Sequence, residues 1–332
     1  MKKFLLFLSL FLFLSNNSSA QQDANFPRRS ALIHSILPGG IPTPFLTQNY
    51  HRFISASTEQ QWSDDREPSV ENLFINGEML NRKRGKTSRI ALGFHFLNQH
   101  TQPIITRSFN PRIALRHRLG KSLSEGSISL GFQPGLIWQT IERATFNPFH
   151  PGDKILLNTE RDRLKINFSA GVSVHRKINE KHTLAGGYSQ IAIRSFNFRA
   201  DHPSEASTQQ IPHHYLHLTH IMGINSYGYL QTQLLYSWIE TQAAQLNIST
   251  RYYRPISTSY EDDKWGLWIG GNWTRNDLPT WGVDVGVGWH RNKLLMLGIG
   301  WEQINIARRE ILSSFNLSLV YAGKKQKKKK RD

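Results

Sequence analysis

The clearest indication of the fold is the segment Trp281-Gly-Val-Asp-Val-Gly-Val-Gly-Trp289. Its odd positions carry Trp, Val, Val, Val and Trp, and its even positions carry Gly, Asp, Gly and Gly. The stretch Trp265-Gly-Leu-Trp-Ile-Gly-Gly-Asn-Trp273 alternates in the same way, with Trp, Leu, Ile, Gly and Trp at its odd positions. Because a β-strand points successive side chains to opposite faces, each segment has one apolar face with an indole near each end.

The length of these two segments fits a membrane. Eight steps of about 3.3 Å span about 26 Å along a strand, or about 20 Å vertically at a tilt of about 40°. This is close to the apolar band of an outer-membrane barrel, whose rims carry aromatic girdles. A soluble β-sandwich is the alternative, but sandwich strands seldom place Trp at both ends of the buried face. We expect a membrane girdle formed by Trp265, Trp273, Trp281, Trp289, Trp301 and Tyr321.

Similar alternation recurs along the chain and predicts about fourteen antiparallel strands. The expected strands are 50–61, 72–79, 88–97, 109–118, 128–138, 164–175, 183–193, 213–224, 227–238, 242–253, 265–274, 281–290, 294–302 and 311–322. The predicted fold class is therefore all-β, a transmembrane outer-membrane β-barrel.

The lengths of the connections predict the orientation. Outer-membrane barrels have short periplasmic turns and longer outer loops. The two longest joins, roughly 139–163 and 194–212, fall on the same side of the expected barrel, and the joins at 177–181 and 224–228 on the other. We expect both termini to be periplasmic, although the join 254–264 is longer than a periplasmic turn should be.

The first twenty residues and the composition predict an exported chain. Lys2 and Lys3 precede the apolar run Phe4 to Leu14, and Ser18-Ser19-Ala20 supplies small residues for cleavage, as in a secretory signal. The chain has no cysteine, which excludes disulfides, thiolate metal sites and a lipid-modified Cys. The mean hydropathy of −0.45 argues against a helical membrane protein but not against a barrel.

The formal net charge of +17 is partly concentrated at the C-terminal end. A run of like charge this dense stays disordered and attracts anions. A solvated tail without a partner, a tether to lipid or a partner in the periplasm, and nucleic-acid binding are the alternatives, and no nucleic-acid module supports the last. The candidate periplasmic docking residues are Lys324, Lys325, Lys327, Lys328, Lys329, Lys330 and Arg331.

The sequence shows no catalytic motif. It contains no G-x-S-x-G elbow, no H-E-x-x-H and no P-loop. In a strand His213 and His217 would share one face while His214 and His220 share the other, so these side chains diverge and predict no metal site. We expect no catalytic residue and no cofactor. A barrel enzyme acting on lipid stays open, because strands bring a Ser and a His together in ways that sequence alone does not show.

A succession of short motifs extends over nearly the whole mature chain. They are Gln21-Gln-Asp-Ala-Asn-Phe26, Glu59-Gln-Gln-Trp62 with Pro68, Ser127-Ile-Ser-Leu-Gly-Phe-Gln-Pro-Gly135, Phe168-Ser-Ala-Gly-Val172, Leu184-Ala-Gly-Gly-Tyr188, His213-His-Tyr-Leu-His217, Trp265-Gly-Leu267 and Leu297-Gly-Ile-Gly-Trp301. In this order the motifs resemble those of the PorP/SprF family, outer-membrane proteins of the type IX secretion and gliding machinery. The family's NPA-x-AG and G-S-H-E segments are missing, where Leu37-Pro-Gly-Gly40 and Ile311-Leu-Ser-Ser-Phe315 stand, and the lysine tail is an addition.

The resemblance implies a non-enzymatic outer-membrane barrel that assists export or surface anchoring of a secreted adhesin-like partner and works with periplasmic secretion components. A passive porin or solute channel is the alternative function. The expected organisation is a signal peptide at 1–20, a periplasmic segment at 21–48, the barrel at 49–322 and a basic disordered tail at 323–332. The expected partners are outer-membrane lipid, the secreted protein and the machinery, without nucleic acid.

Overall fold

The computed structural model describes residues 52–62, 68–80, 87–101, 104–121, 123, 125–141, 163–197, 212–225, 228–239, 242–255, 264–275, 280–290, 293–306 and 310–323. Nearly all of these residues lie in fourteen β-strands. The strands are β1 (Arg52–Trp62), β2 (Pro68–Leu80), β3 (Ser88–Thr101), β4 (Ile104–Arg118), β5 (Gly126–Ile141), β6 (Arg163–Lys177), β7 (His182–Asn197), β8 (His213–Asn225), β9 (Gly228–Ile239), β10 (Gln242–Pro255), β11 (Lys264–Arg275), β12 (Thr280–His290), β13 (Lys293–Ile306) and β14 (Glu310–Gly323).

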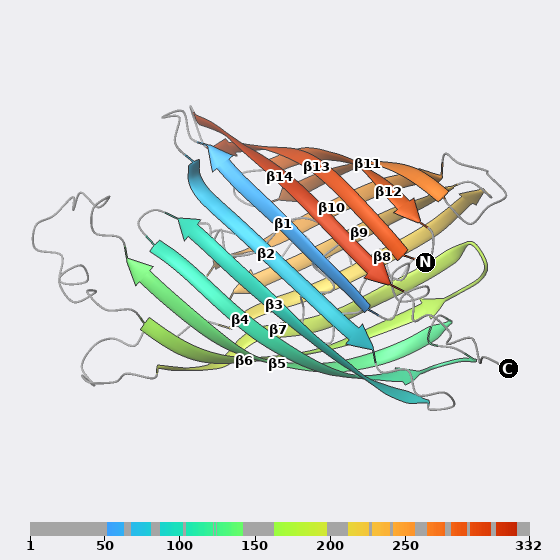
Figure 1. The fold of residues 1–332 in the computed structure, drawn as a ribbon, viewed down its shortest axis with the longest axis horizontal. Helices are drawn as coiled ribbons and strands as arrows, with labels where there is room; N and C mark the ends of the chain where they lie inside the picture. The colour runs from blue at the N-terminus through green and yellow to red at the C-terminus, as the bar shows by residue number, and fades with distance from the viewer. Residues whose placement is uncertain are drawn as a thin grey trace, which may run out of the picture.

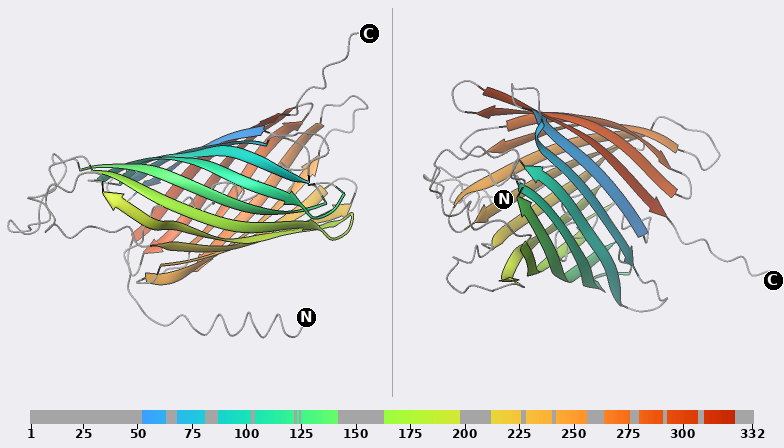
Figure 2. Two further views of the ribbon diagram at one scale, coloured as in Figure 1. Left: turned by 90° about the horizontal axis from the view of Figure 1, so that it is seen from below. Right: turned by 60° about the vertical axis from the view of Figure 1, so that its left-hand side comes forward.

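The fourteen strands form one closed antiparallel barrel (Figure 1). Each strand pairs with its neighbours in the chain, and β1 closes the wall by pairing with β14 from Arg52 opposite Gly323 to Trp62 opposite Ser313. The strands slant around the wall, as closure of a sheet requires (Figure 2). Closure leaves no free sheet edge, so every strand satisfies its backbone donors and acceptors on both sides. The predicted all-β, fourteen-stranded antiparallel barrel is confirmed.

The outer face of the barrel is apolar. On β5 the side chains of Ile128, Leu130 and Phe132 are 37 %, 58 % and 43 % exposed, while the alternating Ser129 and Gln133 are buried. The same alternation places exposed large apolar side chains on β1 to β8 and on β11 to β14. An apolar surface of this extent is suited to lipid, because soluble proteins seldom expose contiguous apolar patches above a few hundred Å².

The inner face is polar, and the described inward side chains are largely buried. Ser, Thr, Asn and Gln dominate, together with a few charged residues and histidines. The buried polar positions of β2 to β6 include Asn76, Glu78, His95, Gln99, Ser108, Asn110, Arg112, Arg116, Ser127, Ser129, Gln133, Lys165, Asn167, Ser169, Ser173 and His175. The barrel therefore has its apolar surface outside and its polar groups inside, the reverse of a soluble protein.

The two ends of the barrel differ in the length of their joins. We call the end where β1 begins and β14 ends the proximal end, and the other the distal end (Figure 1). Strand direction alternates, so the sequence ranges 142–162 and 198–212 connect strands at the distal end, whereas 178–181 and 226–227 do so at the proximal end. The joins 81–87, 119–125 and 256–263, of seven or eight residues, are also proximal. Within the part of the chain that the structure describes, no helix has the length and apolarity to cross a membrane.

Candidate functional site

The tryptophans of the two alternating segments lie opposite one another in the barrel wall. In the register of β11 and β12, Trp265 faces Trp289 and Trp273 faces Trp281, which places the first pair proximally and the second distally. Trp273 and Trp281 are exposed on the outer face. The indole of Trp281 also meets that of Trp301 on β13 edge to face, with ring centroids 5.1 Å apart and an interplanar angle of 80°.

Other predicted site residues are described only in part. The backbone of Tyr321 lies opposite Ile54 and Leu295, near the proximal end, and its side chain is half-buried. The side chains of Trp265 and Trp289 lie outside the described residues, as does the whole basic run from Lys324 to Arg331. The girdle and docking roles therefore stay predictions.

The histidines of β8 diverge, as the strand periodicity predicts. His217 lies on the inner face and is only 3 % exposed. His214 lies on the other face, where its Nδ1 is 2.7 Å from the Tyr188 hydroxyl and its ring stacks on Trp238 at 4.9 Å. Among the described residues, no group of three His, Cys, Asp or Glu side chains could hold a metal ion.

His220 forms a second pair on the outer face of β8. Its Nε2 is 3.0 Å from Nδ1 of His182, and the two ring planes differ by 1°. The ring centroids are 5.3 Å apart, so the rings meet edge to edge and one imidazole donates its N–H to the other. Sequence analysis missed this pair and the Tyr188, His214 and Trp238 cluster, because both join residues of different strands.

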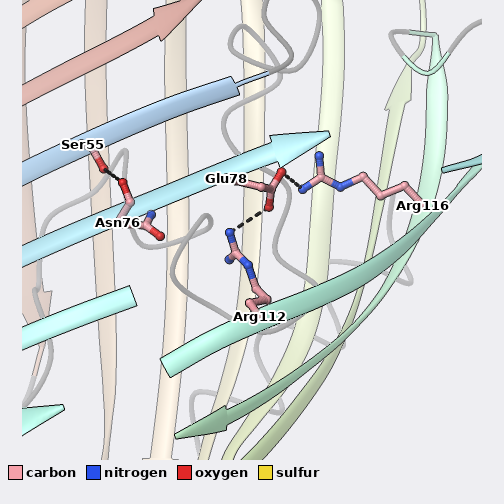
Figure 3. A network of polar contacts seen from close by, with 5 residues as sticks. All are labelled: Ser55, Asn76, Glu78, Arg112 and Arg116. Atoms are coloured by element: carbon pink, nitrogen blue, oxygen red, sulfur yellow. Dashed lines mark hydrogen bonds and ion pairs between the residues drawn. The ribbon is translucent and has the colours of Figure 1, made fainter. Parts of the chain in front are cut away.

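The principal charged site lies inside the barrel. The carboxylate of Glu78, on β2, binds two guanidinium groups from β4 (Figure 3). One carboxylate oxygen is 2.8 Å from Nη2 of Arg112 and the other 2.5 Å from Nη2 of Arg116. All three side chains are at most 3 % exposed. Buried ions are tolerated only when they are paired in this way.

A glycine on the intervening strand makes this contact possible. In the register, Glu78 faces Gly93 on β3, and Gly93 faces Arg112 on β4. A Cβ placed on Gly93 would lie 3.2 Å from Nη2 and 3.3 Å from Nε of Arg112. The guanidinium therefore passes over the bare backbone of β3 to reach the carboxylate two strands away. Beside it, Ala91 and Ala114 are small and buried, which leaves room for Glu78 to reach Arg116 as well.

Further polar side chains lie on the inner face, on the distal side of this ion cluster. Asn110 and Asn167 converge over Gly135 on β5, since a Cβ added there would lie 2.1 Å and 2.0 Å from their Oδ1 atoms. Asn110 donates from Nδ2 to Ser108 at 3.0 Å, and Ser55 on β1 donates to the backbone oxygen of Asn76 at 3.3 Å (Figure 3). This part of the lumen is packed with hydrogen-bonding groups and charge, which suits binding and structural support.

The chain matches the family "Type IX secretion system membrane protein PorP/SprF" over residues 42–321. Among curated proteins, none matches the chain in sequence.

Solved structures of similar fold include outer-membrane channels. The CymD monoaromatic hydrocarbon channel has a TM-score of 0.55 at 8 % identity, over 86 % of this chain and 91 % of that one. A FadL homologue from Pseudomonas aeruginosa has a TM-score of 0.52 at 8 % identity, over 87 % and 95 %. The toluene transporter TbuX from Ralstonia pickettii has a TM-score of 0.51 at 7 % identity, over 88 % and 98 %. At such identities the likeness establishes the barrel fold alone.

Proposed function

The chain belongs to the PorP/SprF family of type IX secretion system membrane proteins, and from this membership we propose that it is a non-enzymatic barrel that assists export or surface anchoring of a secreted adhesin-like protein. The family match carries the proposal, because it covers nearly the whole barrel from β1 to β14. The apolar outer face and the polar inner face are typical of an outer-membrane barrel. They therefore support the outer-membrane location that this role requires.

The difference in join length between the two barrel ends supports a different role for each end. The longest joins, 142–162 and 198–212, connect strands at the distal end, and outer-membrane barrels carry their longer loops on the cell surface. In the proposed orientation these joins engage the exported partner outside the cell. The proximal end, where β1 begins and β14 ends, then faces the secretion components in the periplasm.

The described lumen disfavours a passive channel for apolar solutes. Inward side chains of β2 to β6 are mostly polar and almost inaccessible to water, whereas a wide pore leaves its lining groups hydrated. The hydrocarbon channels of similar fold share the barrel, but at 7–8 % identity they support no transfer of substrate. A porin for polar solutes is the second candidate and predicts steady conductance in planar bilayers.

The deciding experiment is a pull-down from native outer membranes in mild detergent, with an affinity tag inserted in 142–162 and mass spectrometry of the bound proteins. We expect a large secreted protein or type IX components to copurify. The matched control carries the same tag with residues 198–211 replaced by a short Gly/Ser linker, which should reduce recovery of the secreted protein. If the barrel is purified without bound partners and conducts ions in planar bilayers, a porin function would be the better assignment.

The basic tail belongs to the same proposal as a periplasmic docking segment. Deleting residues 324–332 removes seven positive charges and should impair secretion while barrel assembly is unchanged. Replacing the same lysines and Arg331 by Gln separates charge from length. Unaltered secretion in both variants would exclude the docking role.

A further inference from the structure

Among the described residues of β2 to β4, the inner wall near the proximal end carries more positive than negative charge. Three arginines lie there on adjacent strands: Arg89 near the start of β3, and Arg112 and Arg116 toward the end of β4. Glu78 is the carboxylate that neutralises one of these charges, through its two ion pairs. Three positive charges and one negative charge leave two positive charges within this cluster.

Arg89 and Arg116 oppose each other directly. They are cross-strand partners in the register of β3 and β4, and both lie on the inner face, in phase with the buried Ala91 and Ala114. Like charges at opposed positions destabilise a sheet. Within the described part of the chain, Arg89 makes no hydrogen bond or ion pair, and its Nε is buried without a hydrogen-bond partner. The wall therefore holds a cation that the described residues do not compensate.

A third donor extends the same row. Ser129 on β5 is the register partner of Arg116, is completely buried, and its hydroxyl has no hydrogen-bond partner. Arg89, Arg116 and Ser129 thus line one row across three strands, and each presents N–H or O–H donors to the lumen. Arg89 is only partly buried and is the second residue of β3, so the row lies close to the proximal end of the barrel.

We propose that this row is a binding site for an oxyanion, a phosphate or carboxylate group that enters from the proximal mouth. Guanidinium forks match such groups with paired hydrogen bonds, and the interaction gains strength away from bulk water. An oxyanion seated between Arg89 and Arg116 removes their repulsion and accepts a hydrogen bond from Ser129. Glu78 holds Arg116 in place from the other side while leaving Arg89 available.

The test measures anion-dependent stability of the purified full chain in detergent. The thermal unfolding midpoint is recorded in sodium chloride, and then with sodium phosphate or sodium succinate at the same ionic strength. The two arms distinguish free phosphate from a carboxylate as the preferred ligand. A ligand that binds only the folded state raises the midpoint with concentration. We expect at least one of the two oxyanions to do so beyond the effect of chloride.

Arg89→Gln should show two changes together. In chloride its unfolding midpoint should rise above that of the wild type, because the opposed positive charge is gone, and its affinity for the effective oxyanion should fall at least tenfold. Arg176→Gln removes an equal charge from an exposed position on the outer face of β6 at the same end, and it should keep the wild-type response. Unchanged oxyanion affinity in Arg89→Gln, or no response of the wild type beyond chloride, would overturn the proposal.

Discussion

At the scale of single residues, Glu78 stabilises the barrel because its carboxylate compensates the positive charge of two buried arginines. It is ion-paired to Arg112 and Arg116, and all three groups are buried. Removing one partner of a buried ion pair costs about 3–5 kcal/mol, because the remaining charge is left without compensation. We therefore expect Glu78→Gln to lower the free energy of unfolding by about that amount, measured by urea titration of the refolded barrel in lipid vesicles.

The control for this change is Glu180→Gln, in the exposed proximal turn after β6. Exposed substitutions away from packed groups usually alter stability by less than about 0.5 kcal/mol. If the two variants unfolded at the same urea concentration, the buried ion pairs would contribute nothing to stability.

Gly93 provides a second test of the same contact. In Gly93→Ala the new methyl group would lie 2.7 Å from the backbone oxygen of Gly77 and 3.2 Å from Nη2 of Arg112, so the wall or the guanidinium must shift. Overpacking of this kind costs about 1–3 kcal/mol. Gly271→Ala on β11 is the matched control, since its Cβ meets only the Gly282 oxygen at an ordinary 3.6 Å. Urea titration should separate the two variants, and equal midpoints would contradict the packing seen here.

At the scale of strands, the apolar outer face makes a depth-dependent prediction. Leu130, an outward-facing residue within β5, and Ile178, in a proximal turn, are 58 % and 57 % exposed. In water both would accept arginine at little cost. In a bilayer Leu130→Arg should cost more than Ile178→Arg, up to about 2–4 kcal/mol against about 0–1 kcal/mol, because the penalty falls toward the interface. Unfolding measured in lipid vesicles checks this difference, and equal costs would mean that the outer face does not meet lipid.

The alternation of side chains predicted all fourteen strands but not their ends. The segments expected at 88–97 and 109–118 extend in the structure to Ser88–Thr101 and Ile104–Arg118. In these extensions the outward side chains include Asn98 and Arg107, and the Arg107 Nε donates to the Asn98 Oδ1 at 3.1 Å. Hydrophobic periodicity finds only the apolar part of a strand, whereas backbone pairing continues beyond it.

The ion cluster escaped sequence analysis for a different reason. Glu78 and Arg112 are 34 residues apart, and only the register of three strands brings them together. The available signal was the even spacing of Arg112 and Arg116 on the inward phase of β4, with Gly93 on the inward phase of β3. Such a signal predicts charge inside the lumen, but the pairing partner depends on the register, which hydrophobic periodicity constrains only to one face of the strand.

At the scale of the whole molecule, the unequal ends imply a direction of insertion. The joins 142–162 and 198–212 connect strands at the distal end, whereas the longest proximal joins, 81–87, 119–125 and 256–263, have seven or eight residues each. Two distal joins of 21 and 15 residues outweigh three proximal joins of seven or eight residues, since periplasmic turns are short as a rule and surface loops are long. The distal end should therefore lie at the cell surface, and both chain ends in the periplasm.

Single cysteines test this orientation directly, because the chain has no cysteine of its own. Glu180→Cys places a thiol in the exposed proximal turn, and Asp153→Cys places one within the join 142–162. A membrane-impermeant maleimide added to intact cells should label Asp153→Cys and leave Glu180→Cys unlabelled until the outer membrane is permeabilised. Labelling in the reverse order would show that the barrel is inserted in the opposite orientation. The partner-binding and machinery-facing ends would then have to be exchanged. The unmodified chain controls for background labelling, and equal labelling of both variants after permeabilisation shows that each thiol is reactive.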